Sequence, residues 1–316
     1  MRLNLTEVKG YLAYLVSYLL SAGIWCSIRL KTNHTSVLLR KFHDISVRVP
    51  QQISDSRTTW GNTENFLVSL LCCMHAPFWL GMFVFQTESD SAFYTYGYTV
   101  KSSRVQMSLA GIKSLLYCLI FPFFTNMGAF LYCNMCFKSS MLINNLVQKI
   151  EQCPPAFFTT KKRIWILKHK SRIDDVLGDM QNIFSLPSFI IIVSNLLICG
   201  SALSIYLDNS WEDFHTMTFY IEITFYTLSS FGSLMFTLWF AGGIPIVENK
   251  FKDIFHKKMC QRMLFNGSLE DYRIEKWSIA KSDFVFTGCN IISYRRSTAF
   301  ALVGTLVTCT VLVINK

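Results

Sequence analysis

Few side chains within the apolar stretches of this sequence could do chemistry, and Glu222 is the first of them. It is the only acidic residue in the six long apolar runs described below. A carboxylate at such a position is costly unless it faces water or a partner. We therefore weigh two roles for Glu222: a binding group for a small ligand, and a structural partner of a nearby tyrosine or basic group.

Cys133 and Cys136 form a C-x-x-C pair, the spacing of some metal and redox sites. Such sites need further ligands, and neither a second cysteine pair nor a histidine cluster lies nearby. We expect both cysteines to pack in the interior. The apolar runs also contain no paired carboxylates and no nucleophile motif, so the sequence predicts no enzyme, no cofactor and no metal site.

Small and polar residues recur at helical spacing near the C-terminus. Ala301, Gly304, Thr308, Val311 and Asn315 are three, four, three and four residues apart, which places them on one face of a helix. Such a face is typical either of close packing between helices or of a water-filled pore. Periodicity alone leaves both interpretations open.

Membrane helices are the elements expected to position these residues. The chain has 316 residues, of which 51% are hydrophobic and 16% charged, against about 25% charged in a soluble domain. Six apolar runs are long enough to cross a bilayer, which takes about 20 residues of helix. They are residues 10–28, 65–86, 114–137, 184–207, 218–246 and 298–314. A cleaved signal peptide is the alternative for the first run.

The distribution of basic residues orients these runs. The segments 29–64, 138–183 and 247–297 carry 24 Lys and Arg residues, whereas the four alternate segments carry six. The positive-inside rule places the three basic segments in the cytoplasm and both termini outside, in a multi-pass protein of the cell membrane. These loops account for the net charge of +10, and no aromatic-basic patch accompanies it, so we expect no nucleic-acid partner.

Two of the predicted cytoplasmic segments contain amphipathic helices. In residues 171–187, apolar residues recur every three or four positions: Ile173, Val176, Leu177, Met180, Ile183 and Phe184. Residues 248–264 repeat the pattern with Phe251, Ile254, Phe255 and Met259. We expect these faces to pack against each other below the bilayer, and helices lying flat in the lipid interface are the alternative. The motif CPPAF at 153–157 predicts a break between helices.

The C-terminal stretch TCTVLVINK resembles the signature TYhhhhhQF, with h apolar, that ends the last span of arthropod gustatory receptors. Thr308 is the shared threonine, while Cys309, Asn315 and Lys316 replace Tyr, Gln and Phe at the same spacing. The stretch DDVLGDMQNIFSLP is similar to the helix that leads into the fifth span of that family. The resemblance covers most of the chain and implies an all-α, polytopic membrane bundle of the inverted seven-span type.

Because that family has seven spans, the six runs here match spans two to seven, and the first span is expected to be missing from a truncated chain. The expected parts are three spans in 1–137, a cytoplasmic helical anchor in 138–183, two spans in 184–246, a second anchor segment in 247–297 and a pore-lining span in 298–316.

The resemblance implies a ligand-gated, non-selective cation channel of four subunits, formed by this chain alone or with other gustatory receptor subunits in membrane lipid. Carried over by position, Asn315 and Lys316 fall at the gate, and Thr308, Val311 and Leu312 line the conduit. Lys316 departs from the family pattern, because four ammonium groups would repel cations. We expect its flexible side chain to turn toward water.

Aromatic side chains in the outer halves of the other spans predict a pocket for a small-molecule tastant. The residues expected to bind it are Glu222, Tyr220, Tyr226, Trp79, Tyr117 and Phe121. Aromatic residues also gather at the lipid interface at this depth, which is the alternative for part of this set.

Two other classes of membrane protein compete with this interpretation. A G-protein-coupled receptor would place the C-terminus inside, and the sequence contains neither a DRY-like triplet nor an NPxxY motif at a span end. A secondary transporter commonly shows internal repeats and paired charges within the membrane, and neither is evident.

Overall fold

The computed structural model describes residues 5–48, 102–207, 217–264 and 284–314. Its helices are α1 (Leu5–Leu30), α2 (Thr32–Arg48), α6 (Ser103–Cys118), the π-helical turn η1 (Leu119–Phe123), α7 (Phe124–Glu151), the 3-10 turn η2 (Pro155–Phe157), α8 (Thr160–Leu207), α9 (Met217–Met263) and α11 (Arg296–Ile314). A small antiparallel hairpin of β1 (Thr287–Gly288) and β2 (Ile292–Ser293) precedes α11. The prediction of an all-α membrane bundle is confirmed.

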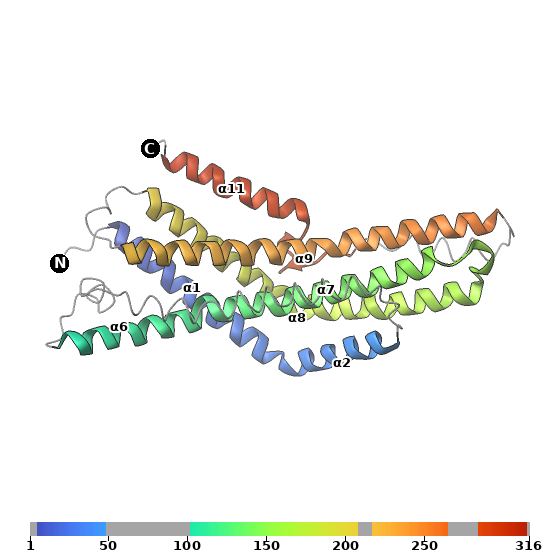
Figure 1. Cartoon of the computed structure of the whole chain (residues 1–316), viewed down its shortest axis with the longest axis horizontal. Helices are drawn as coiled ribbons and strands as arrows, with labels where there is room; N and C mark the ends of the chain where they lie inside the picture. The colour runs from blue at the N-terminus through green and yellow to red at the C-terminus, as the bar shows by residue number, and fades with distance from the viewer. Residues whose placement is uncertain (1–4, 49–101, 208–216, 265–283, 315–316) are drawn as a thin grey trace.

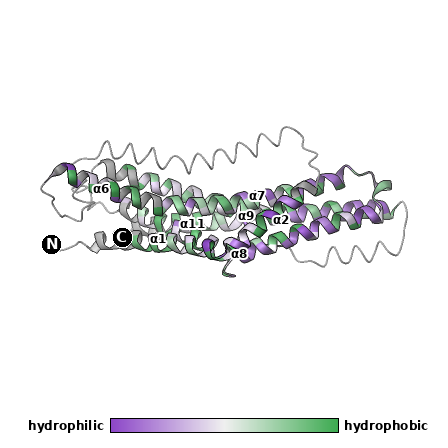
Figure 2. Ribbon diagram, turned by 90° about the horizontal axis from the view of Figure 1, so that it is seen from below, coloured by the Kyte–Doolittle hydropathy of each residue, from purple (hydrophilic) through white to green (hydrophobic). Residues whose placement is uncertain are grey.

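Three long helices, α7, α8 and α9, lie along one another and form the axis of the molecule (Figure 1). Both α1 and α2 pack on α8. Hydrophobic residues are concentrated in the half that holds α1, α6 and α11, whereas hydrophilic residues gather toward the other end of α7, α8 and α9 (Figure 2). The bundle is therefore divided along its length into an apolar half and a polar half.

Three helical stretches of the described residues are long and apolar enough to cross a membrane: Ile120–Glu151, Thr160–Leu203 and Ile223–Met263. They contain most of the predicted spans 114–137, 184–207 and 218–246. The first predicted run falls in the shorter apolar helix Leu15–Leu30, and the last falls in α11. The predicted span 65–86 lies outside the described residues.

The amphipathic stretches expected below the membrane continue α8 and α9 without a break. Leu177 of α8, Phe255 and Met259 of α9, and Leu146 of α7 belong to one buried cluster. The apolar faces pack against each other, so this prediction is confirmed and the lipid-interface alternative is wrong. Each aliphatic side chain removed from water there contributes about 1.5–3 kcal/mol to stability.

The predicted break at CPPAF is η2, which separates α7 from α8. Phe158, directly after it, is fully buried and packs edge-on against Phe255 of α9, with the ring centroids 5.6 Å apart. Pro187, in contrast, lies inside α8, which continues through it as a single helix of 48 residues. One helix thus connects the polar half of the bundle to the apolar half.

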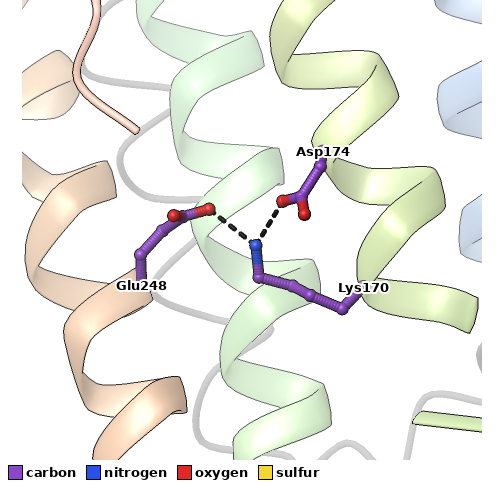
Figure 3. Close-up of polar contacts among 3 residues, drawn as sticks. All are labelled: Lys170, Asp174 and Glu248. Atoms are coloured by element: carbon purple, nitrogen blue, oxygen red, sulfur yellow. Dashed lines mark hydrogen bonds and ion pairs between the residues drawn. The ribbon is translucent and has the colours of Figure 1, made fainter. Parts of the chain in front are cut away.

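In the polar half, Lys170 of α8 is held between two carboxylates (Figure 3). Its Nζ donates to Oε1 of Glu248 on α9 over 2.7 Å, and also to Asp174, one turn further along α8. The side chains of Lys170 and Glu248 are only 11% and 4% exposed to solvent. Buried charges are tolerated when they are paired, so this contact fixes how α8 and α9 are aligned.

Candidate functional site

A buried aromatic cluster lies in the apolar half, where four elements meet. Phe121 of η1 and Tyr226 of α9 are 2% and 4% exposed, and both pack with Ile198 of α8. Tyr18 of α1 meets the Phe121 ring edge-on with centroids 6.4 Å apart, and the ring of Phe225 packs against the cluster beside Tyr226. Two of the six predicted ligand-binding residues, Phe121 and Tyr226, are therefore brought together.

A local break in the helix sets the position of Phe121. Pro122 has no N–H to donate and interrupts regular α-helical bonding. The chain forms the π-helical turn η1 there, and Phe121 leaves helical geometry with φ −138° and ψ 128°. The turn is therefore a kink between α6 and α7, of the kind that proline commonly causes. This irregularity coincides with Phe121, a predicted ligand residue.

Polar side chains without partners lie next to this cluster. Ser194 and Asn195 of α8 and Ser230 of α9 are fully buried. Among the described residues, the Oγ of both serines and both amide atoms of Asn195 have no hydrogen-bond partner. A buried polar group that makes no hydrogen bond costs free energy, and the usual explanation is a bound water or ligand.

The alignment of α8 and α9 places these polar groups at one level. The helices run antiparallel, because Lys170 meets Glu248 while Cys199 Sγ lies 4.0 Å from the carbonyl oxygen of Thr227. Continuing this alignment by one turn brings Asn195 level with Ser230. Neither Asn195 nor Ser230 was predicted as a site residue. Their position as polar residues inside apolar runs could have indicated them.

Three of the other four predicted ligand residues lie in the helices α6 and α9. Tyr220 and Glu222 lie in the first turns of α9, and Glu222 is four residues before Tyr226, on the same side of the helix. Tyr117 lies in α6, next to η1. Trp79 is outside the described residues. The ligand-binding roles of these four residues stay predictions.

The stripe of small and polar residues on α11 points away from the rest of the chain. Ala301, Gly304 and Thr308 are exposed, and a Cβ on Gly304 would meet nothing within 4 Å. Thr308 donates its hydroxyl to the carbonyl oxygen of Gly304 over 2.8 Å. Over 301–308 the described residues do not cover this face, and both interpretations of the stripe stay predictions. Val311 and Leu312 continue α11, whereas Asn315 and Lys316 are outside the described residues.

The hairpin before α11 is docked on α8 by two polar side chains. The amide nitrogen of Gln181 donates to both the carbonyl oxygen and the hydroxyl of Thr287, over 2.8 and 2.7 Å, and its Oε1 accepts the Thr287 N–H over 3.0 Å. Ser185 accepts the N–H of Cys289 over 2.9 Å and donates to Thr287. We call this arrangement of Gln181, Ser185, Thr287 and Cys289 the hairpin dock.

Tyr294 secures the same hairpin from its other end. Its ring is fully buried against Tyr132 and its hydroxyl lies 2.9 Å from Ser188 Oγ, on the same side of α8 as the hairpin dock. A Cβ on Gly288 would lie 2.3 Å from that hydroxyl, so only glycine fits there. Burial raises the pKa of Tyr294, and the hydrogen bond to Ser188 opposes this shift only in part. The phenol is therefore neutral at physiological pH.

The first turn of α11 rests on α9. The guanidinium of Arg296 lies over the ring of Trp239, 4.2 Å from its centroid. Gly242 allows the backbones to approach, since a Cβ there would lie 2.6 Å from the nitrogen of Arg296. Beyond Ala299, which is fully buried, α11 diverges from α8 and α9 (Figure 1), and among the described residues its stripe at Ala301, Gly304 and Thr308 is exposed.

Cys133 and Cys136 are 5% and 0% exposed and belong to the interior of α7. Cys136 lies in the large buried cluster, and both cysteines are free thiols. Their predicted role as packing residues is confirmed.

Two solved structures share this fold. The insect olfactory receptor OR5 from Machilis hrabei aligns with a TM-score of 0.72 and 11% identity over 99% of this chain and 82% of that chain. The same receptor in complex with eugenol gives a TM-score of 0.68 and 11% identity over 100% and 83%. No protein-family model matches the sequence, and no curated protein matches it significantly. The chain therefore has the fold of an insect chemosensory receptor, as its sequence predicts.

Proposed function

We propose that this protein is a chemosensory receptor of the gustatory type, a ligand-gated, non-selective cation channel that detects small tastants. The observation that carries the proposal is a chemoreceptor fold in which the polar stripe of the last helix, over 301–308, is not covered by the described residues. The gustatory assignment rests on the C-terminal stretch TCTVLVINK, because the similar solved structures are of an olfactory receptor.

In this proposal α11 lines the pore. Four copies of the helix, from this chain alone or with other gustatory receptor subunits, face one another across a central axis in the cell membrane. Thr308, Val311 and Leu312 line the conduit, and Asn315 and Lys316 form the gate. The exposed face at Gly304 and Thr308 supports this role, since a neutral polar lining can pass hydrated cations and apolar neighbours can close it by dewetting.

The ligand binds among the outer halves of the spans. Phe121 and Tyr226 supply aromatic walls, and the unpartnered amide of Asn195 supplies hydrogen bonds at their base. Glu222, Tyr220, Trp79 and Tyr117 complete the proposed site. Eugenol, the ligand of the similar olfactory receptor, combines an aromatic ring with hydrogen-bonding oxygens, and this chemistry suits such a lining.

The helix α8 couples the two sites. Ile198 of α8 belongs to the aromatic cluster, with Asn195 about one turn before it, and Gln181 and Ser185 of the same helix hold the hairpin that leads into α11. The fourteen residues from Gln181 to Asn195 span about 21 Å at the rise of an α-helix. A shift of α8 on ligand binding therefore moves the base of the pore helix, provided that the hairpin dock holds.

Current recording tests this function. The chain is expressed in cells, alone and with a second gustatory receptor subunit, and surface biotinylation shows that it reaches the membrane. Eugenol, a sugar and a bitter compound are then applied under voltage clamp. We expect at least one of them to evoke an inward current that reverses near 0 mV. Surface expression without any evoked current would contradict the proposal.

The orientation of the chain separates this proposal from a G-protein-coupled receptor. An epitope tag added after Lys316 is expected to bind antibody on intact cells, because the three basic segments hold 24 of the 30 Lys and Arg residues and should stay inside. A tag between residues 264 and 284 serves as the matched control and should become accessible only after permeabilisation. The opposite pattern would reject the channel proposal.

A further inference from the structure

A second candidate site lies at the tip of the polar half, far from the aromatic cluster. An open cavity of about 670 Å³ separates the end of α7 from the beginning of α8. The side chains that matter for its chemistry are Lys149, Gln152, Thr159, Lys161, Lys162 and Trp165. Three of the lining residues are lysines and none is acidic. The lining is therefore strongly basic.

Lys149 is the centre of this lining. Its ammonium lies over the ring of Trp165, 5.2 Å from the ring centroid. Partial burial lowers its pKa, as expected for an ammonium that loses water. Among the described residues, the ion pairs involve Lys41 and Lys170, and Lys149 has no carboxylate partner. An anion in the cavity would supply the charge that Lys149 lacks.

Trp165 forms a fixed wall of the cavity. Its ring lies against that of His169 at a tilt of 35°, with centroids 4.0 Å apart, and the His169 ring nitrogen lies 2.9 Å from the carbonyl oxygen of Trp165. The indole is thereby held in place under the Lys149 ammonium. A cation over an aromatic ring is also stabilised by the ring itself, which keeps Lys149 directed into the cavity.

The beginning of α8 adds a second source of positive potential. The first turn of this 48-residue helix opens on the cavity at Thr159 and Lys162, and the Lys162 N–H lies 3.4 Å from the hydroxyl of Thr159. Helix N-termini attract anions through the helix dipole and through those first-turn N–H groups that no side chain caps. Here that end coincides with three ammonium groups from two helices.

The end of α9 holds this tip in shape. Lys258 donates to the carbonyl oxygen of Glu151 over 3.3 Å, and Arg262 donates to that of Ala156 over 3.2 Å. Both contacts fix the loop between α7 and α8 while adding two further cations nearby. The cavity is thus lined by α7, α8 and the loop between them, and α9 supports that loop from outside.

We propose that this cavity binds a small, soluble anion that carries phosphate groups. Several ammonium groups beside a helix N-terminus match the multiple charge and the acceptor oxygens of phosphate better than a single carboxylate. A soluble source is favoured over a lipid headgroup, because Lys149 lies twelve residues beyond the predicted end of the span at 137, about 18 Å along α7. Bound there, the anion would brace the α7–α8 tip against α9.

Titration calorimetry on the purified full chain in detergent tests this site, with sodium tripolyphosphate as the probe at 150 mM KCl. We expect saturable binding of one probe per chain. Lys149→Gln should weaken binding at least tenfold, and Lys149→Arg should restore most of it. Lys168→Gln is the matched control, because Lys168 is exposed on α8 and does not line the cavity. It should change the affinity less than threefold.

Three results would overturn the proposal. The first is no saturable binding of tripolyphosphate to a chain that elutes as one species. The second is an equal loss of affinity in Lys149→Gln and Lys168→Gln, which would indicate general attraction to a basic surface. The third is binding only to vesicles with phosphatidylinositol bisphosphate, compared with phosphatidylcholine alone, which would assign the site to a lipid. None of these measurements depends on conduction, so they are independent of the proposed channel function.

Discussion

Lys170 of α8 and Glu248 of α9 form an ion pair of 2.7 Å in the interior of the polar half, with side chains only 11% and 4% exposed. Asp174 provides a second carboxylate for the same ammonium. Lys170 and Glu248 are 78 positions apart in the sequence. The ion pair therefore aligns two helices that are distant along the chain. Its cost in desolvation is offset only while all three groups are present.

Removing one member of this group should destabilise the bundle. Lys170→Met leaves two buried carboxylates facing each other and is expected to cost about 3–5 kcal/mol, whereas Glu248→Leu leaves Asp174 as a partner and should cost less. The double variant should lose less than the sum of the single variants. Thermal unfolding in detergent measures this. Lys41→Met is the control: it breaks the exposed pair with Asp179 and should change stability by less than about 1 kcal/mol.

Asn195 should matter for ligand response and not for folding. Its amide is buried without a partner among the described residues, so Asn195→Leu removes an unsatisfied group and should leave the thermal midpoint unchanged or higher. The half-maximal ligand concentration should rise at least tenfold, because the ligand loses its hydrogen bonds. A lower midpoint together with an unchanged ligand response would show that Asn195 is structural.

Phe121 and Phe124 provide a matched pair of substitutions near η1. Phe121 is 2% exposed in the aromatic cluster, whereas Phe124, one turn on, is 39% exposed. We expect Phe121→Leu to reduce ligand potency about tenfold and to cost about 1–2 kcal/mol by leaving a gap in the packing. Phe124→Leu should have little effect on potency. Equal shifts in the dose–response curves of the two variants would exclude a specific role for the cluster.

The hairpin dock should transmit the ligand signal to α11. Gln181→Ala removes three hydrogen bonds to Thr287, so we expect the maximal evoked current to fall severalfold at equal surface expression, with a smaller change in half-maximal concentration. Asn182→Ala is the control, because Asn182 is the next residue along α8 and is exposed. Maximal currents that match in the two variants would indicate that the dock plays no part in coupling.

Local patterns in the sequence predicted the parts of this fold that local chemistry determines. The apolar face at Ile173 and Leu177 is buried, and η2 forms at CPPAF. The helical anchor expected from residue 138 is the extension of α7 to Glu151, but the sequence did not show that its buried residues Leu146 and Ile150 would join α8 and α9 in one core.

Most contacts between residues of the candidate sites could not be predicted from the sequence. Gln181 meets Thr287 across 106 positions, and Asn195 becomes notable only once its lack of a partner is known. Periodicity shows which face of a helix is apolar, but it does not show which distant segment covers that face. Phe121 and Tyr226 were predicted individually, from residue type and depth, and their contact with Ile198 required the fold.

Thiol modification of α11 tests most directly whether this helix lines a cation pore. Thr308 and Val307 are neighbours on α11 and both are exposed, but they point about 100° apart around the helix. Each is replaced by cysteine in a Cys309→Ser background, and a charged methanethiosulfonate reagent is applied from outside during evoked current. We expect Thr308→Cys channels to lose most of their current irreversibly and Val307→Cys channels to keep theirs. Current through Thr308→Cys that is unaffected by the reagent would contradict a pore lined by this face of α11.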